Sequence, residues 1–166
     1  TGADTVTLSF FKDVSEAIPH VHHEPEFNDF ERQPLLPFKL SQPGPGIAWF
    51  DLDGDGRDDL IIGTGSGGAP AVFRSDGRGG FSRNAHAPTA LVSSDTAGVI
   101  GWADASGKRT LLTSLTGYEA PARQGVLQFR LVDSRLQPAE PVASEISNGG
   151  ALALGDIDGN GQLALF

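Results

Sequence analysis

Short apolar runs separated by turn residues extend along the chain. Several of them alternate apolar and polar positions, as in Leu127–Leu131, which is the period-2 pattern of a strand with one buried face. No stretch shows a 3.6-residue period over about 11 residues, although Val14–Ile18 predicts one helical turn after Asp13. The pattern predicts an all-β protein with strands at Val6–Phe11, Gly46–Phe50, Leu60–Ile62, Ala71–Phe73, Val99–Ala103, Thr110–Leu115, Val126–Val132, Ala151–Leu154 and Leu163–Phe166.

Two segments repeat the same order of features. Gly46–Asp59 and Gly150–Ala164 each contain a short apolar run, the motif Asp-x-Asp-Gly-(Asp/Asn)-Gly and a second apolar run. Val99–Thr113 lies midway between them and has Asp104 in the corresponding turn. A unit of about 52 residues that holds about four short strands has the size of a β-propeller blade.

The repeat also predicts how the chain is divided. We expect a partial β-propeller of two to three four-stranded blades. Its parts are an N-terminal strand and ordered Pro/His-rich loop over 1–45, a blade with an intact acidic loop over 46–97, a blade with a degenerate loop over 98–149, and the start of a third blade over 150–166. A closed propeller has about four to eight blades, and an open one exposes strand edges. We therefore expect a longer polypeptide or partner chains to cover the open sides.

Composition narrows the class of protein. Gly and Pro supply 22 and 11 of the 166 residues, which leaves little room for long helices. A formal net charge of −9 argues against nucleic acid and anionic membrane surfaces as partners. No apolar run approaches the ~20 residues of a bilayer span. Because there is no Cys, disulfides and thiolate metal sites are excluded and the redox compartment stays open.

The segment between the N-terminus and the first repeat differs from the rest. It is rich in Pro, His and acidic residues, and proline is excluded from helix interiors and from sheet ladders. We expect a long ordered loop, held down by its apolar residues Phe27, Phe30, Leu35, Leu36, Phe38 and Leu40.

Carboxylates occupy alternate positions of the first acidic loop. With Asp51 as position 1, carboxylates fill positions 1, 3, 5, 8 and 9, and Gly56 at position 6 permits a sharp turn. Alternate side chains of such a loop converge on one point, and this set of oxygens suits Ca²⁺ better than Mg²⁺. An EF-hand is excluded because position 12 is Ile62 and both flanks look like strands. The predicted ligands are Asp51, Asp53, Asp55, the Arg57 carbonyl and Asp59; the alternative is a bare acidic surface turn.

The second acidic loop is a weaker version of the first. Position 9 is Ala164, so one carboxylate is missing, and position 5 carries an amide. The lower charge predicts a lower affinity for Ca²⁺. The predicted ligands are Asp156, Asp158, Asn160 and the Gln162 carbonyl, and the alternative is an Asx-type turn without an ion. The middle turn has only Asp104 and Ser106, and we expect no ion there.

The first repeat resembles the FG-GAP repeat of integrin α-chain propellers and the VCBS-type repeats of bacterial proteins. The matching features are the strand IAWF, the acidic loop, the strand LIIG, the turn Gly68-Ala69-Pro70, the strand AVFR and the hairpin Asp76–Phe81. The start of the chain, including Phe10–Val14, resembles bacterial secreted relatives of cartilage acidic protein. The resemblance is strongest over 46–83, good over 147–166 and weak over 84–146. It implies a β-propeller whose nine-residue loops bind Ca²⁺ through the residues named above.

Three further features have simpler interpretations. Gly63–Gly68 formally matches a dinucleotide fingerprint, but Pro70 and a strand follow where a helix is required, so we expect a turn. His20–Glu24 (HVHHE) lacks the spacing of a zinc protease, and a solvated or capping loop is favoured over a transition-metal site. Trp49 and Trp102 precede their loops at similar points. We expect them to pack in the core, with a ligand-stacking surface as the alternative.

These features together predict a non-catalytic, calcium-stabilised module that has an interaction or structural role. Millimolar calcium outside the cytoplasm fills loops of moderate affinity, so we expect an extracellular, cell-surface or periplasmic location. We expect no enzyme activity, because no nucleophile, base and oxyanion set accompanies the ion ligands. The expected partners are other protein chains or further blades. The alternative is the propeller portion of a secreted polysaccharide-acting enzyme, with a carbohydrate ligand.

Overall fold

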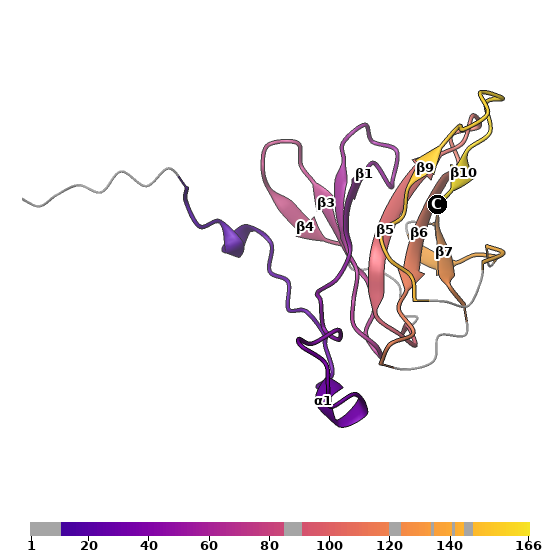
Figure 1. The fold of residues 1–166 in the computed structure, drawn as a ribbon. Helices are drawn as coiled ribbons and strands as arrows, with labels where there is room; N and C mark the ends of the chain where they lie inside the picture. The colour runs from indigo at the N-terminus through magenta and orange to yellow at the C-terminus, as the bar shows by residue number, and fades with distance from the viewer. Residues whose placement is uncertain (1–10, 85–90, 120–123, 134, 141, 145–147) are drawn as a thin grey trace, which may run out of the picture.

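The protein is mostly β in a computed structural model that describes residues 11–84, 91–119, 124–133, 135–140, 142–144 and 148–166. The strands form three separate antiparallel sheets, and none of the three closes on itself (Figure 1). The helices of the described part are the 3₁₀ turn Ser15–Ala17 and α1 (Asp29–Arg32). Neither of them is long or apolar enough to cross a membrane.

The two larger sheets are successive four-stranded meanders, in which each strand pairs with the next along the chain. The first contains β1 (Ile47–Phe50), β2 (Asp59–Ile62), β3 (Ala71–Ser75) and β4 (Phe81–Arg83). The second contains β5 (Thr96–Ala103), β6 (Arg109–Leu115), β7 (Val126–Val132) and β8 (Arg135–Pro138). The third is the two-stranded hairpin of β9 (Leu154–Gly155) and β10 (Ala164–Leu165).

The prediction of an all-β chain is confirmed, and the finer prediction of a propeller stays a prediction. The sequence pattern missed β4 and β8, because each is a short edge strand with a single large apolar residue, Phe81 or Leu136. The predicted helical turn at Val14–Ile18 is present as the 3₁₀ turn. The predicted strand Val6–Phe11 lies outside the described residues except for Phe11, which is in no strand.

One apolar core lies between the two larger sheets. Its fully buried residues come from both of them and from the loop after β1: Leu52, Ile61, Val72, Leu111, Phe129 and Leu136. The sheets approach closely where the Phe50 ring covers Gly101, since a Cβ at that glycine would lie 2.3 Å from the ring. Each sheet therefore depends on the other for the burial of its inner face.

A buried carboxylate organises the segment before β1, and the expectation that apolar residues hold this segment is wrong for four of the six residues. The exceptions are Leu36, which is half-buried, and Phe27, which is half-buried with its ring edge-on to Tyr118. Leu35 is 97% exposed, and Phe30, Phe38 and Leu40 are also exposed. Asp29, at the start of α1, is instead fully buried. Six prolines keep this segment from forming a ladder of backbone hydrogen bonds, so side-chain hydrogen bonds supplement a backbone bond from the N–H of Gly65 to the His23 carbonyl and the packing of Ile18 on the first sheet.

Asp29 accepts hydrogen bonds from two neighbouring residues that lie 11 and 12 positions later in the segment. Its Oδ1 accepts from the backbone N–H of Leu40 at 2.7 Å and of Ser41 at 2.9 Å, and its Oδ2 accepts from the Ser41 hydroxyl. Burial acts to raise the pKa of Asp29, but the hydrogen bonds from Ser41 and Leu40 lower that pKa to about 2. The ionised carboxylate closes a loop of α1 and the residues after it.

Candidate metal centre

The first acidic loop joins β1 to β2 at the end of the first sheet that lies away from α1 (Figure 1). The structure brings together carboxylate oxygens of Asp51, Asp53 and Asp55, all within 4.8 Å of one another. Leu52 points the other way, into the core between the sheets, and is only 2% exposed. Successive side chains of the loop thus point to opposite sides, with an anchoring leucine on one side and three carboxylates on the other.

The backbone of this loop turns tightly around Asp51. The Asp51 carboxylate accepts hydrogen bonds from the N–H of Gly54 at 2.7 Å and of Gly56 at 3.1 Å. Both glycines have φ near +85°, a conformation that other residues rarely adopt. Burial acts to raise the pKa of Asp51, but the two backbone donors and the charge of Arg109 lower it overall. Asp51 is therefore ionised throughout the neutral range.

Asp59 lies at the base of the loop, outside this group of three. It is the first residue of β2 and is 2% exposed. Its carboxylate accepts from the N–H of Leu52 at 3.3 Å and of Ser75 at 3.2 Å, which ties the loop to β3. Burial and the charges of Asp53 and Asp55 raise the pKa of Asp59. A cation above the three carboxylates would relieve this repulsion.

The side chains of three arginines pair with the loop carboxylates, and the acidic motif does not predict these ion pairs. Arg109 of β6 donates from Nε to the Asp51 carbonyl at 2.7 Å and from Nη2 to the Asp51 carboxylate at 3.2 Å. The guanidinium of Arg57 lies 3.5 Å from the Asp55 carboxylate. Arg74 of β3 pairs with Asp53. The loop is thus linked to its own sheet and, through Arg109, to the second sheet.

The second acidic loop, between β9 and β10, shares two of the hydrogen bonds of the first. The Asp156 carboxylate accepts from the N–H of Gly161, as Asp51 accepts from Gly56, at 2.8 Å. The Asn160 side-chain oxygen accepts from the N–H of Gln162 at 2.7 Å, as the position-5 Asp of the first loop accepts from Arg57. The Asn160 amide also donates to Asp158 at 2.8 Å. The three predicted side chains and the residue that supplies the predicted carbonyl, Gln162, therefore belong to one turn.

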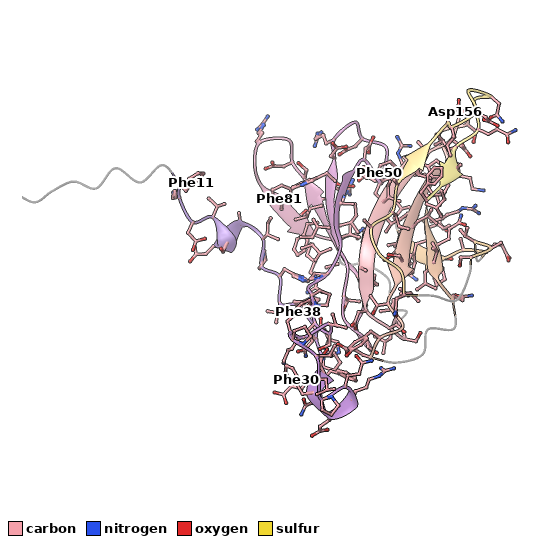
Figure 2. All side chains as sticks on the ribbon, in the orientation of Figure 1. Phe11, Phe30, Phe38, Phe50, Phe81 and Asp156 are labelled. Atoms are coloured by element: carbon pink, nitrogen blue, oxygen red, sulfur yellow. The ribbon has the colours of Figure 1, made fainter. Side chains whose placement is uncertain are left out.

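This second loop lacks the anchor of the first. Figure 2 shows Asp156 at the free end of the β9–β10 hairpin. Ile157, which corresponds to the buried leucine of the first loop, is 68% exposed. The loop is therefore held by its own hydrogen bonds and by the short hairpin. A more mobile loop of lower charge should bind a cation less tightly than the first.

The middle turn closes on its own backbone. The Asp104 carboxylate accepts from the N–H of Ser106 at 2.9 Å, from the Ser106 hydroxyl at 2.5 Å and from the N–H of Lys108 at 3.0 Å. These bonds with Ser106 and Lys108 outweigh desolvation and lower the pKa of Asp104. The single carboxylate of this turn thus acts as an Asx cap.

A second group of carboxylates lies near α1, away from the loops. Oxygens of Glu24, Asp95 and Glu119 are within 4.8 Å of one another, and Asp95 is buried. Ser66 donates its N–H to Asp95 at 2.8 Å, and Gln42 donates its N–H to Glu119 at 3.2 Å. The three acids come from three distant segments with no shared motif, so no sequence signal could have found them.

This group makes stability depend on pH. Burial, followed by the charges of Asp95 and Glu24, raises the pKa of Glu119 to about 7. A carboxyl whose pKa is higher in the folded than in the unfolded state stabilises the fold fully at pH values below its unfolded pKa. That stabilisation is lost as pH rises from about 4.5 to 7. We expect Glu119→Gln to be more stable than the wild type at pH 8 and to lose this advantage at pH 5, as measured by urea unfolding at both values. An equal difference at the two pH values would contradict this assignment.

The other sequence features lie as follows. His20 is half-buried with its ring edge-on to Phe73, and His22 Nε2 lies 3.0 Å from the Glu24 carboxylate, so the motif is only partly solvated. The Gly63–Gly68 segment leads into a strand, as expected. Trp49 is 55% exposed beside Phe81, and the expectation of core packing is wrong for it, because it lies on the outer face of β1. Trp102 is half-buried.

Two groups of acidic side chains in the described part of the chain are thus close enough to hold a metal ion. The group in the first loop combines three converging carboxylates with a rigid base, while the group near α1 lacks a motif. Comparisons of the chain with protein-family models, with curated proteins and with solved structures find no match. The functional conclusion therefore depends on the geometry of the loops.

Proposed function

We propose that this chain is a calcium-binding, non-catalytic structural or interaction module. The observation that carries the proposal is the convergence of Asp51, Asp53 and Asp55 within 4.8 Å of one another on a loop anchored from below. Ca²⁺ takes six to eight oxygen ligands at about 2.3–2.6 Å and tolerates irregular geometry. The Arg57 carbonyl and Asp59 would complete the set in the first loop, and Asp156, Asp158, Asn160 and the Gln162 carbonyl would form the weaker second site.

The ion would act as a cross-link between strands. The first loop joins β1 to β2, and Asp59 connects its base to β3 through Ser75. An ion that binds the folded loop and not the unfolded chain stabilises the fold by mass action. We propose an extracellular, cell-surface or periplasmic location, because millimolar calcium there fills sites of moderate affinity.

The proposed partners are other β-sheets, either further blades of an FG-GAP or VCBS-type β-propeller or separate protein chains. Apolar side chains on two surfaces support this. Ile47 and Trp49 are more than half exposed on β1, and Leu163 and Phe166 are more than half exposed on either side of β10. Apolar patches of this kind mark surfaces that other protein elements cover.

Calcium titration tests the proposal. We expect isothermal calorimetry on chelator-treated protein to show one stronger and one weaker site. At about 100 times the Kd, the bound ion adds about 2.7 kcal/mol, which raises Tm by about 5–10 °C in a domain of this size. Mg²⁺ should give a smaller shift, because it demands regular octahedral geometry. Absence of both binding heat and thermal shift would reject the proposed function.

A further inference from the structure

A cavity of about 330 Å³ lies between the first acidic loop and the hairpin that joins β3 to β4. Arg57 lines it from the loop, Arg74 and Ser75 line it from β3, and Ser82 lines it from β4. Both guanidinium groups are about half exposed. Each of them uses part of its donor set for a loop carboxylate and has further N–H groups available.

Acidic groups at the cavity are already engaged. The Asp76 carboxylate lines the wall, but its Oδ1 accepts from the N–H of Arg78 at 2.7 Å and of Gly80 at 2.9 Å. Asp55, which also lines it, belongs to the group of three carboxylates. The loop carboxylates therefore balance Arg57 and Arg74, and the charge of Asp76 also acts on Arg57.

Calcium in the loop would change this balance. The loop has five aspartates, and three arginines pair with it, so the loop and these arginines have a formal charge of −2. Asp76 in the cavity wall adds one further negative charge. Ca²⁺ held by Asp51, Asp53 and Asp55 would bring the charge of the loop and its arginines to zero. Arg74, which pairs with Asp53, would then lose much of its counter-charge, while Arg57 would keep that of Asp76.

We propose that this cavity binds a carboxylate group of a ligand when the first loop holds Ca²⁺. The inference rests on the proposed function. The planar forks of Arg57 and Arg74 match the geometry of a carboxylate, and Ser82, which pairs with Arg74 across β3 and β4, offers a hydroxyl donor on the same face. Since coupling between two sites is reciprocal, the carboxylate raises calcium affinity as much as calcium raises carboxylate affinity.

The test measures the Kd for calcium with and without two carboxylate probes. Glucuronate represents a free sugar acid, and N-acetylglutamate α-amide represents an acidic side chain of a protein. Their neutral counterparts are glucose and N-acetylglutamine amide. We expect at least one acid to lower the Kd for calcium about fivefold or more and neither neutral compound to change it. The acid with the larger effect identifies the source of the carboxylate.

Matched variants locate the effect. In Arg74→Gln, the Kd for calcium should be the same with and without the acid, whatever the substitution does to calcium binding itself. Arg78→Gln removes the same charge from the adjacent turn, where the side chain is exposed and does not line the cavity, and should keep the ratio. The inference alone is overturned if the acid still lowers the Kd for calcium in Arg74→Gln. It is also overturned if the wild type binds calcium and neither acid changes that Kd. Absence of calcium binding in plain buffer overturns the proposed function and this inference together.

Discussion

Asp55→Asn is expected to weaken the proposed calcium binding by the first loop about tenfold or more, at least the loss typical of changes to groups that only support metal ligands. Asp55 supplies one of the three converging carboxylates and belongs to the exposed part of the loop. Its Oδ1 accepts from the N–H of Arg57 at 2.9 Å, a bond that the oxygen of asparagine can keep. The substitution therefore removes a charged ligand while it preserves the shape of the turn. Calorimetric titration of the variant and the wild type in the same buffer measures the effect.

Asp58→Asn is the matched control for this result. Asp58 lies in the same loop, carries the same charge and is exposed, but it is not among the predicted ligands or the converging carboxylates. We expect its substitution to change the Kd for calcium by no more than long-range electrostatics allows, and less as salt rises. If both variants lose affinity equally, the loop attracts calcium only by its total charge, and the assignment of ligands by position is wrong.

The arrangement of the acidic loops could be read from the sequence because it is local. Alternate side chains of a tight turn point to the same side, and glycines at fixed positions permit the backbone conformation. The spacing of Asp51, Asp53 and Asp55 was therefore enough to predict that their side chains converge. The same reasoning placed Asp156 and Asn160 in a turn of the same kind, 105 positions later.

Contacts between distant segments could not be read in this way. The arginine that pairs with Asp51 comes from the second sheet, and no pattern in the sequence links Arg109 to that loop. The carboxylate group of Glu24, Asp95 and Glu119 likewise depends on how three segments meet. Hydropathy also gave a wrong prediction for the segment before β1. Most of the apolar residues that were expected to hold it are exposed, and a buried aspartate organises it.

The two acidic loops share a motif but differ in what lies beneath them. Position 2 of the first loop is Leu52, which packs in the core between the large sheets. Position 2 of the second loop is Ile157, which is exposed. Both residues are apolar and flanked by aspartates, so the sequence alone treats them as equivalent. The difference arises from the presence of a second sheet against the first loop, and it predicts which loop is preorganised for an ion.

Leu52→Ala is expected to lower the free energy of unfolding by about 2–5 kcal/mol, the cost of removing a large aliphatic side chain from a packed core. It should also weaken calcium binding, because the same residue fixes the loop that carries the carboxylates. Urea unfolding in chelator gives the first effect, and calcium titration of the folded variant gives the second.

Ile157→Ala is the corresponding change in the second loop, and we expect it to alter stability by no more than about 0.5 kcal/mol, as for other exposed positions. Equal losses in the two variants would mean that both loops are buried by protein in solution, and that the second loop is anchored as firmly as the first. A loss of stability in Leu52→Ala with unchanged calcium affinity would separate the core from the ion site. The loop would then bind calcium through its own turn geometry, and the anchor would serve the fold alone.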